Sequence, residues 1–251
     1  MKASARIVAR TEPDGGVTRL KTLAGEAPLM LRRTSPADPL APARVHLVGG
    51  TAGPIGGDEL RCTIDVGPGA RLEVRSVAAS VALPGPQGRA SRMDIEAKVA
   101  QRARLAWRPE PTVAARGANH RLRARVELSD DAALVWRVEL LLGRDGEDSG
   151  SVAARLRVVR GGRVLLDHEI AVGPEYPGSL GPGVAGGHRA VGTVLVVEPR
   201  WEQDPPKLAD PCDAVGGGCA ALRLSGPAVL ITAAAPDGPT LSRLLDGAIP
   251  A

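Results

Sequence analysis

Glycine and proline interrupt this sequence at short intervals from one end to the other. The 251 residues include 31 glycines and 22 prolines, and both residue types destabilise helices. Between these breaks, short runs alternate apolar with polar side chains, as in residues 5–10 (ARIVAR) and 121–128 (RLRARVEL). A period of two residues is typical of strands that bury one face. The sequence therefore predicts a mainly β protein with many short strands and tight turns.

The predicted strands follow one another along most of the chain. Residues 5–10 and 17–22 flank residues 13–16 (PDGG), which predicts an opening β-hairpin. Gly161 and Gly162 give the clearest two-residue hairpin signal, because glycine adopts the positive φ that such turns require. The other strand-like runs are residues 28–33, 44–48, 60–66, 70–76, 93–99, 103–107, 121–128, 132–142, 153–160, 163–172 and 190–197.

Three of these runs resemble one another. Residues 70–75 (ARLEVR), 103–108 (ARLAWR) and 132–137 (AALVWR) are spaced by 33 and 29 residues. Similar strands at near-regular spacing suggest stacked antiparallel or mixed sheet layers, either β-helix-like or sandwich-like. The alternative is a chance similarity in a sequence rich in Ala, Arg and Val. We expect residues 1–251 to form a single domain whose core is built from Val, Leu, Ile and Ala, because the chain has no Phe.

Helix is expected only near the C-terminal end of the sequence. Residues 207–222 are broken by one proline and three consecutive glycines. Residues 237–247 are the best helical candidate, because Asp237 can cap them and Leu241, Leu244 and Leu245 fall on one face. We expect this short helix to pack at the edge of the sheets.

The formal net charge of +4 and the pI near 9.3 raise the question of nucleic-acid binding. Arginine alternates with apolar residues, as at Arg121, Arg123 and Arg125, without forming a block. Aromatic residues, which stack on bases, make up only 2% of the chain. The sequence favours a solvated basic surface and no nucleic-acid partner.

The three cysteines and the hydropathy pattern indicate the cellular compartment of the protein. Three thiols without an apolar leader sequence suggest reduced cysteines and a cytoplasmic protein. No run of about 18 apolar residues occurs, so no membrane segment is expected.

Motifs for catalysis and nucleotide binding are weak. Residues 181–186 (GPGVAG) match the dinucleotide pattern GxGxxG, but they lie in a Gly- and Pro-rich stretch, residues 174–188, that we expect to form a loop. No phosphate-binding GxxxxGK[ST] motif and no nucleophile–base pattern occurs. The sequence therefore gives no indication of an enzyme.

Two groups of residues are possible metal ligands by type. His168 stands between Asp167 and Glu169, which is either a metal patch or a solvated strand end. Cys212 and Cys219 bracket a glycine-rich loop, but two thiols do not complete a structural zinc site. They are either a soft-metal pair or two ordinary thiols.

Several segments in sequence order resemble the urease accessory protein D family, UreD (also called UreH), of the actinobacterial type. The match covers about residues 5–245. It rests on the segments GGTAGPIGGD (49–58), GPGARLEVR (67–75), SVAASVALP (76–84), LAWRPEPTV (105–113) and LGRDGE (142–147), followed by the hairpin at 155–167 and the strand containing Gly192 and Thr193.

The resemblance implies a non-catalytic scaffold that helps deliver nickel to urease. Members of the family join an F-type urease accessory protein and a G-type accessory GTPase, and dock on the urease apoenzyme. Nickel is thought to pass through the protein along a water-filled passage. A passage needs weak oxygen ligands, because a tight cage would trap the ion. No tightly bound cofactor is therefore expected, only transient Ni²⁺.

The resemblance also nominates residues. The candidates for the passage lining are Asp58, Glu139, Glu147, Asp167 and Glu169. The candidates for partner binding or for holding structural motifs are Gly56, Gly57, Asp58, Trp107, Pro109, Pro111 and Arg144.

The sequence departs from the family in two ways. Many members have an aromatic-rich core and longer C-terminal helices, which this chain lacks. Val138 replaces a glutamate that is common in the family, and Glu139 would face the opposite side of a strand. The alternatives to a nickel scaffold are a generic β interaction module without a metal role and a small hydrolase with an unrecognised site.

Overall fold

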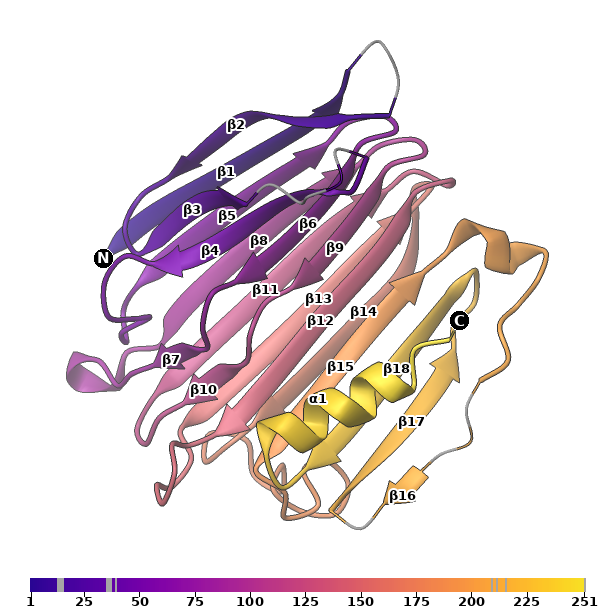
Figure 1. Ribbon diagram of the computed structural model, residues 1–251. Coiled ribbons are helices and arrows are strands. Elements are labelled where there is room, and N and C mark those ends of the chain that lie inside the picture. The colour runs from indigo at the N-terminus through magenta and orange to yellow at the C-terminus, as the bar shows by residue number, and fades with distance from the viewer. Residues whose placement is uncertain are drawn as a thin grey trace.

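Two β-sheets packed face to face make up most of the molecule, as the computed structural model shows (Figure 1). The structure describes residues 1–12, 16–34, 38, 40–208, 210, 212–214 and 216–250, with the side chains of 212–214 left out. Most of the turn predicted at residues 13–16 lies outside the described residues. The mainly β prediction is confirmed.

The small sheet has seven strands: β1 (Lys2–Thr11), β2 (Thr18–Gly25), β5 (Glu59–Val66), β8 (Ser91–Val99), β11 (Asn119–Leu128), β13 (Ser151–Arg160) and β14 (Arg163–Val172). The large sheet has eleven strands: β3 (Leu29–Thr34), β4 (Ala43–Gly49), β6 (Arg71–Ser76), β7 (Ser80–Ala82), β9 (Arg104–Arg108), β10 (Thr112–Ala114), β12 (Ala133–Leu142), β15 (Ala190–Val197), β16 (Cys212–Ala214), β17 (Gly217–Arg223) and β18 (Ala228–Ala235). The helical segments are η1 (Pro86–Gly88), η2 (Pro199–Glu202) and α1 (Gly238–Gly247).

The central part of the chain winds like a β-helix. From β5 to β13 the chain passes alternately from one sheet to the other, and each circuit adds a parallel strand to both. The three similar segments found in the sequence become β6, β9 and β12, which are parallel neighbours. Their leucines Leu72, Leu105 and Leu134 lie in register. The similarity therefore reflects the repeated winding and not chance.

Antiparallel hairpins close the sheets at their ends. β1 pairs with β2, and β13 pairs with β14, both as predicted. Gly161 and Gly162 have φ values of 53° and 79°. Positive φ at both positions is the geometry of a two-residue hairpin turn that only glycine adopts without strain.

The core between the sheets is aliphatic, as the missing Phe predicts. Ile7, Leu72 and Leu105 are among its fully buried side chains. Its aromatic members are Trp107 and Trp136, whose rings stack with centroids 5.1 Å apart.

Helix α1 begins where the sequence predicts. Asp237 is the N-cap and accepts a hydrogen bond of 2.7 Å from the Thr240 amide. Leu241 and Leu245 are fully buried. As expected, the helix packs near one edge of the large sheet, where it covers the outer face of β15, β17 and β18 (Figure 1). The reason is that these strands present a second apolar face, which the helix buries.

Strands β17 and β18 were not predicted. Gly216, Gly217 and Gly218 indicated a break, yet β17 starts at Gly217. β18 is buried on both faces, between the core and α1, so it lacks the alternation that marks a half-buried strand.

Candidate functional site: a cavity through the large sheet

A cavity of about 520 Å³ extends from the small sheet through the large one. Its inner wall is formed by side chains of the small sheet that face the core, among them Leu60, Met93, Ile95, His120, Leu122 and Ala124. The stacked Trp107 and Trp136 line it on the side of the large sheet. Arg137 and Glu139, whose side chains lie toward α1, also line it. The cavity therefore reaches both faces of the large sheet.

A break in strand pairing makes this possible. β9 pairs with β12 only at residues 133–136, and β10 pairs with β12 only at residues 140–142. The chain between β9 and β10 leaves the ladder, and so does the chain between β6 and β7. We call the resulting break the window and define it by residues 77–79, 109–110 and 137–139, all of which line the cavity.

The edges of the window are tied together by hydrogen bonds. The Glu110 amide donates to the Ser76 hydroxyl at 2.9 Å, and the Ser80 amide donates to the Pro111 carbonyl at 2.9 Å. Pro109 lines the cavity directly. Prolines suit this segment because they cannot donate to a strand ladder. The Trp-Arg-Pro-Glu-Pro stretch of the sequence is therefore one edge of the window.

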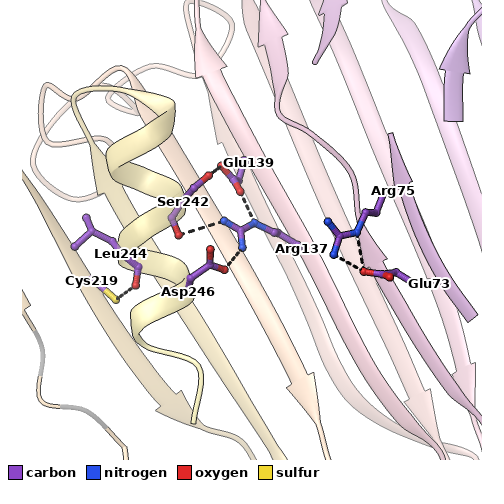
Figure 2. Close-up of polar contacts among 8 residues, drawn as sticks. All are labelled: Glu73, Arg75, Arg137, Glu139, Cys219, Ser242, Leu244 and Asp246. Atoms are coloured by element: carbon purple, nitrogen blue, oxygen red, sulfur yellow. Dashed lines mark hydrogen bonds and ion pairs between the residues drawn. The ribbon is translucent and has the colours of Figure 1, made fainter. Parts of the chain in front are cut away.

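A buried ionic network joins the window to helix α1 (Figure 2). Arg137 donates to Glu139 on the same strand and to Asp246 on α1. The Ser242 hydroxyl of α1 donates to Glu139 at 2.8 Å. Glu139 is only 5% exposed. Burial alone would lower the pKa of Arg137, but Glu139 and Asp246 hold it above its usual value.

A second buried carboxylate lies on β6. Glu73 accepts hydrogen bonds of 2.7 Å from both Arg44 and Arg75. Figure 2 shows the bond from Arg75. Burial alone would raise the pKa of Glu73, but the two arginines hold it below its usual value. The outer face of the large sheet therefore carries paired charges on both β6 and β12.

His120 is the imidazole of the cavity wall. It is 2% exposed, and its Nδ1 lies 2.8 Å from the Ser91 hydroxyl. Burial lowers the pKa of His120 to about 4, so the ring is neutral near pH 7. A neutral imidazole is a ligand for Ni²⁺ and similar ions.

Asp58 has a structural environment. Its carboxylate accepts a 2.9 Å hydrogen bond from the Ile55 amide and lies 2.8 Å from the amino group of Met1. It is 5% exposed, and it is not among the residues that line the cavity. This geometry favours the turn-capping role over a role in the passage.

The two glycines before Asp58 serve different purposes. Gly57 has a φ of +93°, which favours glycine. Gly56 does not have positive φ. A Cβ at Gly56 would lie 2.3 Å from the Arg89 carbonyl oxygen and 2.5 Å from the Gly85 amide nitrogen. Gly56 is therefore required by the close approach of two chain segments.

The remaining candidate carboxylates lie outside the cavity lining. Glu147 pairs with Arg144 through two hydrogen bonds of 2.9 and 2.8 Å, which lower the pKa of Glu147 to about 2. Asp167 accepts hydrogen bonds from two arginines on the outer face of the small sheet. Glu169 is exposed on that same face. Of the five passage candidates, only Glu139 lines the cavity.

The metal patch considered around His168 does not form. His168 is half-buried and alternates with exposed Asp167 and Glu169, so it faces the other side of β14. Within the described residues, no group of three His, Cys, Asp or Glu side chains is placed to hold a metal ion. Residues 212 and 219 are opposite each other in the backbone ladder of β16 and β17, but the side chain of Cys212 lies outside the described part of the structure. The Cys219 thiol donates to the Leu244 carbonyl at 3.7 Å.

Glu110, His120 and Arg137 are among the cavity residues that sequence reasoning did not nominate. Glu110 lay inside the proline stretch, where its position between two prolines was the available signal. His120 and Arg137 have no local sequence signal, because they reach the cavity only through the packing of the two sheets and of α1.

Among the described residues, no helix is long and apolar enough to cross a membrane.

Comparisons with known proteins agree on one family. Residues 2–250 match the family model described as UreD urease accessory protein. Proteins named urease accessory protein UreD are 44% identical in Streptomyces avermitilis, over 99% of this chain and 96% of that protein, and 44% identical in Frankia alni, over 92% and 86%. A UreD 2 of Saccharopolyspora erythraea is 39% identical over 98% and 86%. The chain belongs to the UreD family of urease accessory proteins.

Proposed function

We propose that this protein is a non-catalytic, cytoplasmic scaffold of urease maturation and that its internal cavity conducts Ni²⁺ toward the urease apoenzyme. The observation that carries the proposal is the cavity, which passes through the window from one face of the large sheet to the inner face of the small one. A scaffold of this kind works with urease, an F-type accessory protein and a G-type accessory GTPase.

The chemistry of the lining suits transit better than storage. His120 offers a neutral nitrogen, and Glu110 and Glu139 offer oxygens, but these residues come from two strands and a loop and do not form a closed ligand set. Glu139 is already held by Arg137 and Ser242. Sites that bind a cation through few ligands release it readily, which conduction requires. Much of the remaining wall is aliphatic or aromatic and offers no ligand.

The test is to fill the cavity without touching its polar residues. Ala124 and Ala154 line it from β11 and β13. The double variant Ala124→Leu and Ala154→Leu places extra methyl groups in existing space, which a protein tolerates better than the overpacking of a filled core. We expect co-expressed urease to contain at least severalfold less nickel, while pull-down shows that the complex still assembles.

Ala24→Leu on the exposed part of β2 is the matched control and should leave the nickel content unchanged. The proposal fails if urease is fully loaded with nickel by a variant whose crystal structure shows the cavity filled. That result, together with a complex that still supports activation, would favour a β interaction module without a metal role.

A further inference from the structure

The outer face of the small sheet carries a cluster of arginines at its centre. We call it the arginine face and define it by six residues on β8, β11 and β13: Arg92, Arg121, Arg123, Arg125, Arg155 and Arg157. On β11 the arginines alternate with side chains that face the core, which fixes them on the outside. Arg121, Arg123, Arg125 and Arg155 are exposed, so the described part of the chain leaves this face open.

The register brings like charges together. In the parallel ladders, Arg121 lies beside Arg92, Arg123 lies beside Arg155, and Arg125 lies beside Arg157. Neighbouring strands are about 4.8 Å apart, and like charges at adjacent positions destabilise a sheet. These three like-charge contacts oppose folding, although Asp94 lies beside Arg123 and Glu96 lies beside Arg125 in the same sheet.

Internal carboxylates neutralise only part of the cluster. Asp167 accepts from both Arg155 and Arg157, at 2.8 and 2.6 Å. Arg125 pairs with Glu127, and Arg92 pairs with Asp94.

Two arginines at the centre are not held in an ion pair by any carboxylate of the described residues. These are Arg121 and Arg123, which lie in the middle of the sheet and not at its edge. Guanidinium groups that are not engaged in an ion pair present donors that fit an external carboxylate.

The pattern around these two residues fits a protein better than a nucleic acid. Asp94 and Glu96 lie directly beside Arg123 and Arg125, and they would repel a continuous phosphate backbone. Bases also need aromatic rings to stack on. Trp107, Trp136 and Trp201 are all buried elsewhere.

We propose that the arginine face is a docking surface for an acidic protein surface, whose carboxylates bind Arg121 and Arg123. The choice of probe rests on the proposed role in urease maturation, but the inference is independent of nickel transit. Docking on this face leaves the window, on the other sheet, uncovered.

The experiment compares binding of the full-length chain to each candidate partner, measured by biolayer interferometry. The partners are the urease apoenzyme, the F-type accessory protein and the G-type GTPase, each purified separately. Arg121→Gln with Arg123→Gln removes two unpaired charges and keeps polar side chains. Arg19→Gln with Lys21→Gln on edge strand β2 removes the same charge and is the matched control.

We expect the β11 double variant to bind one of these partners at least tenfold more weakly, with little change for the control. The wild-type affinity for that partner should fall as salt rises, and less so for the variant. Thermal unfolding should show that the variant stays folded with a stability close to that of the wild type, because like-charge contacts with Arg92 and Arg155 and the contact of Arg123 with Asp94 are lost together. Equal affinities of both double variants for all three partners, no binding by the wild type, or equally tight binding to duplex DNA would each overturn the proposal.

Discussion

The neutral histidine in the cavity wall shows how burial sets the chemistry of a single residue. His120 is nearly inaccessible, and Ser91 is its hydrogen-bond partner in the described structure. Charging the ring would place a cation among Leu60, Met93 and Leu122, which is costly without a carboxylate beside it. The same burial keeps the ring available as a ligand at neutral pH.

The first prediction concerns the pH dependence that follows. The pKa of His120 is about 4 in the folded protein and about 6.5 in the unfolded chain. Below pH 6.5 the unfolded state therefore binds a proton that the native state does not, so stability is lost as pH falls from 6.5 to 4. This residue alone should account for about 3 kcal/mol of that loss.

The measurement is the free energy of unfolding from denaturant titrations at several pH values. His120→Gln retains a polar side chain beside Ser91 but does not titrate, so its stability should fall less steeply than that of the wild type below pH 6.5. The carboxylates contribute to both curves and cancel in the difference. Identical slopes for the two proteins would show that His120 is not held neutral by burial.

At this scale the sequence predicted the type of a residue better than its surroundings. Gly57 and Arg144 were nominated by the resemblance as structural or partner-binding residues, and the structure gives Gly57 a positive φ and pairs Arg144 with Glu147. The cavity position of His120 depends on a sheet formed by distant segments, which no local pattern contains. For the same reason, Glu169 was nominated by its type although it lies on the opposite side of the small sheet from the cavity.

At the scale of elements, α1 and β12 are joined by charge as well as by apolar packing. The side chains of Arg137 and Glu139 are 11% and 3% exposed, whereas that of Asp246 is 62% exposed. The pair within β12 is therefore the buried part of the network, and the bond to Asp246 is its solvent-facing end. Removing one member of a buried pair leaves the other charge uncompensated.

The second prediction is a double-mutant cycle on this pair. Glu139→Leu should lower the free energy of unfolding by about 3 kcal/mol or more, because Arg137 keeps only the exposed Asp246 as an ionic partner. Arg137→Met together with Glu139→Leu should cost less than the sum of the single variants. Asp246→Asn should cost about 1 kcal/mol or less, because its side chain is exposed.

The readouts are chemical denaturation and hydrogen exchange of the α1 amides. Loss of protection in α1 should accompany the Glu139 variant, since Ser242 loses its acceptor. Strict additivity of the two substitutions would contradict a coupled pair.

The elements differ in how far the sequence predicted them. Helix α1 was predicted because its cap and its leucine spacing are local features. Most half-buried strands were predicted because they alternate. β18 was missed because α1 covers its outer face and removes the alternation. The break between β9 and β10 was also missed, since sequence reasoning does not show which part of β12 loses its partner.

At the scale of the whole molecule, the winding explains why a repeated motif and the cavity behind the window coexist. Every circuit contributes inward side chains at the same register, and this produced the recurrent Ala-x-Leu pattern of the sequence. The cavity forms where small residues such as Ala124 and Ala154 face the window. The cavity exists because of the sizes of many side chains that come together from distant segments. The sequence alone does not reveal which of them meet.

The last prediction tests whether stability is transmitted along the winding. Leu72, Leu105 and Leu134 form a buried column, each at most 1% exposed. Leu105→Ala should cost about 3 kcal/mol, because it removes buried methyl groups and leaves a void in the middle of the column. Leu222→Ala, at a position that is 51% exposed, is the control and should change stability by about 0.5 kcal/mol or less.

In a wound fold each circuit contacts mainly its neighbours, so hydrogen exchange in the Leu105→Ala variant should accelerate first in β6, β9 and β12 and least in β17. Equal acceleration in all strands would show instead that the two sheets open as one unit.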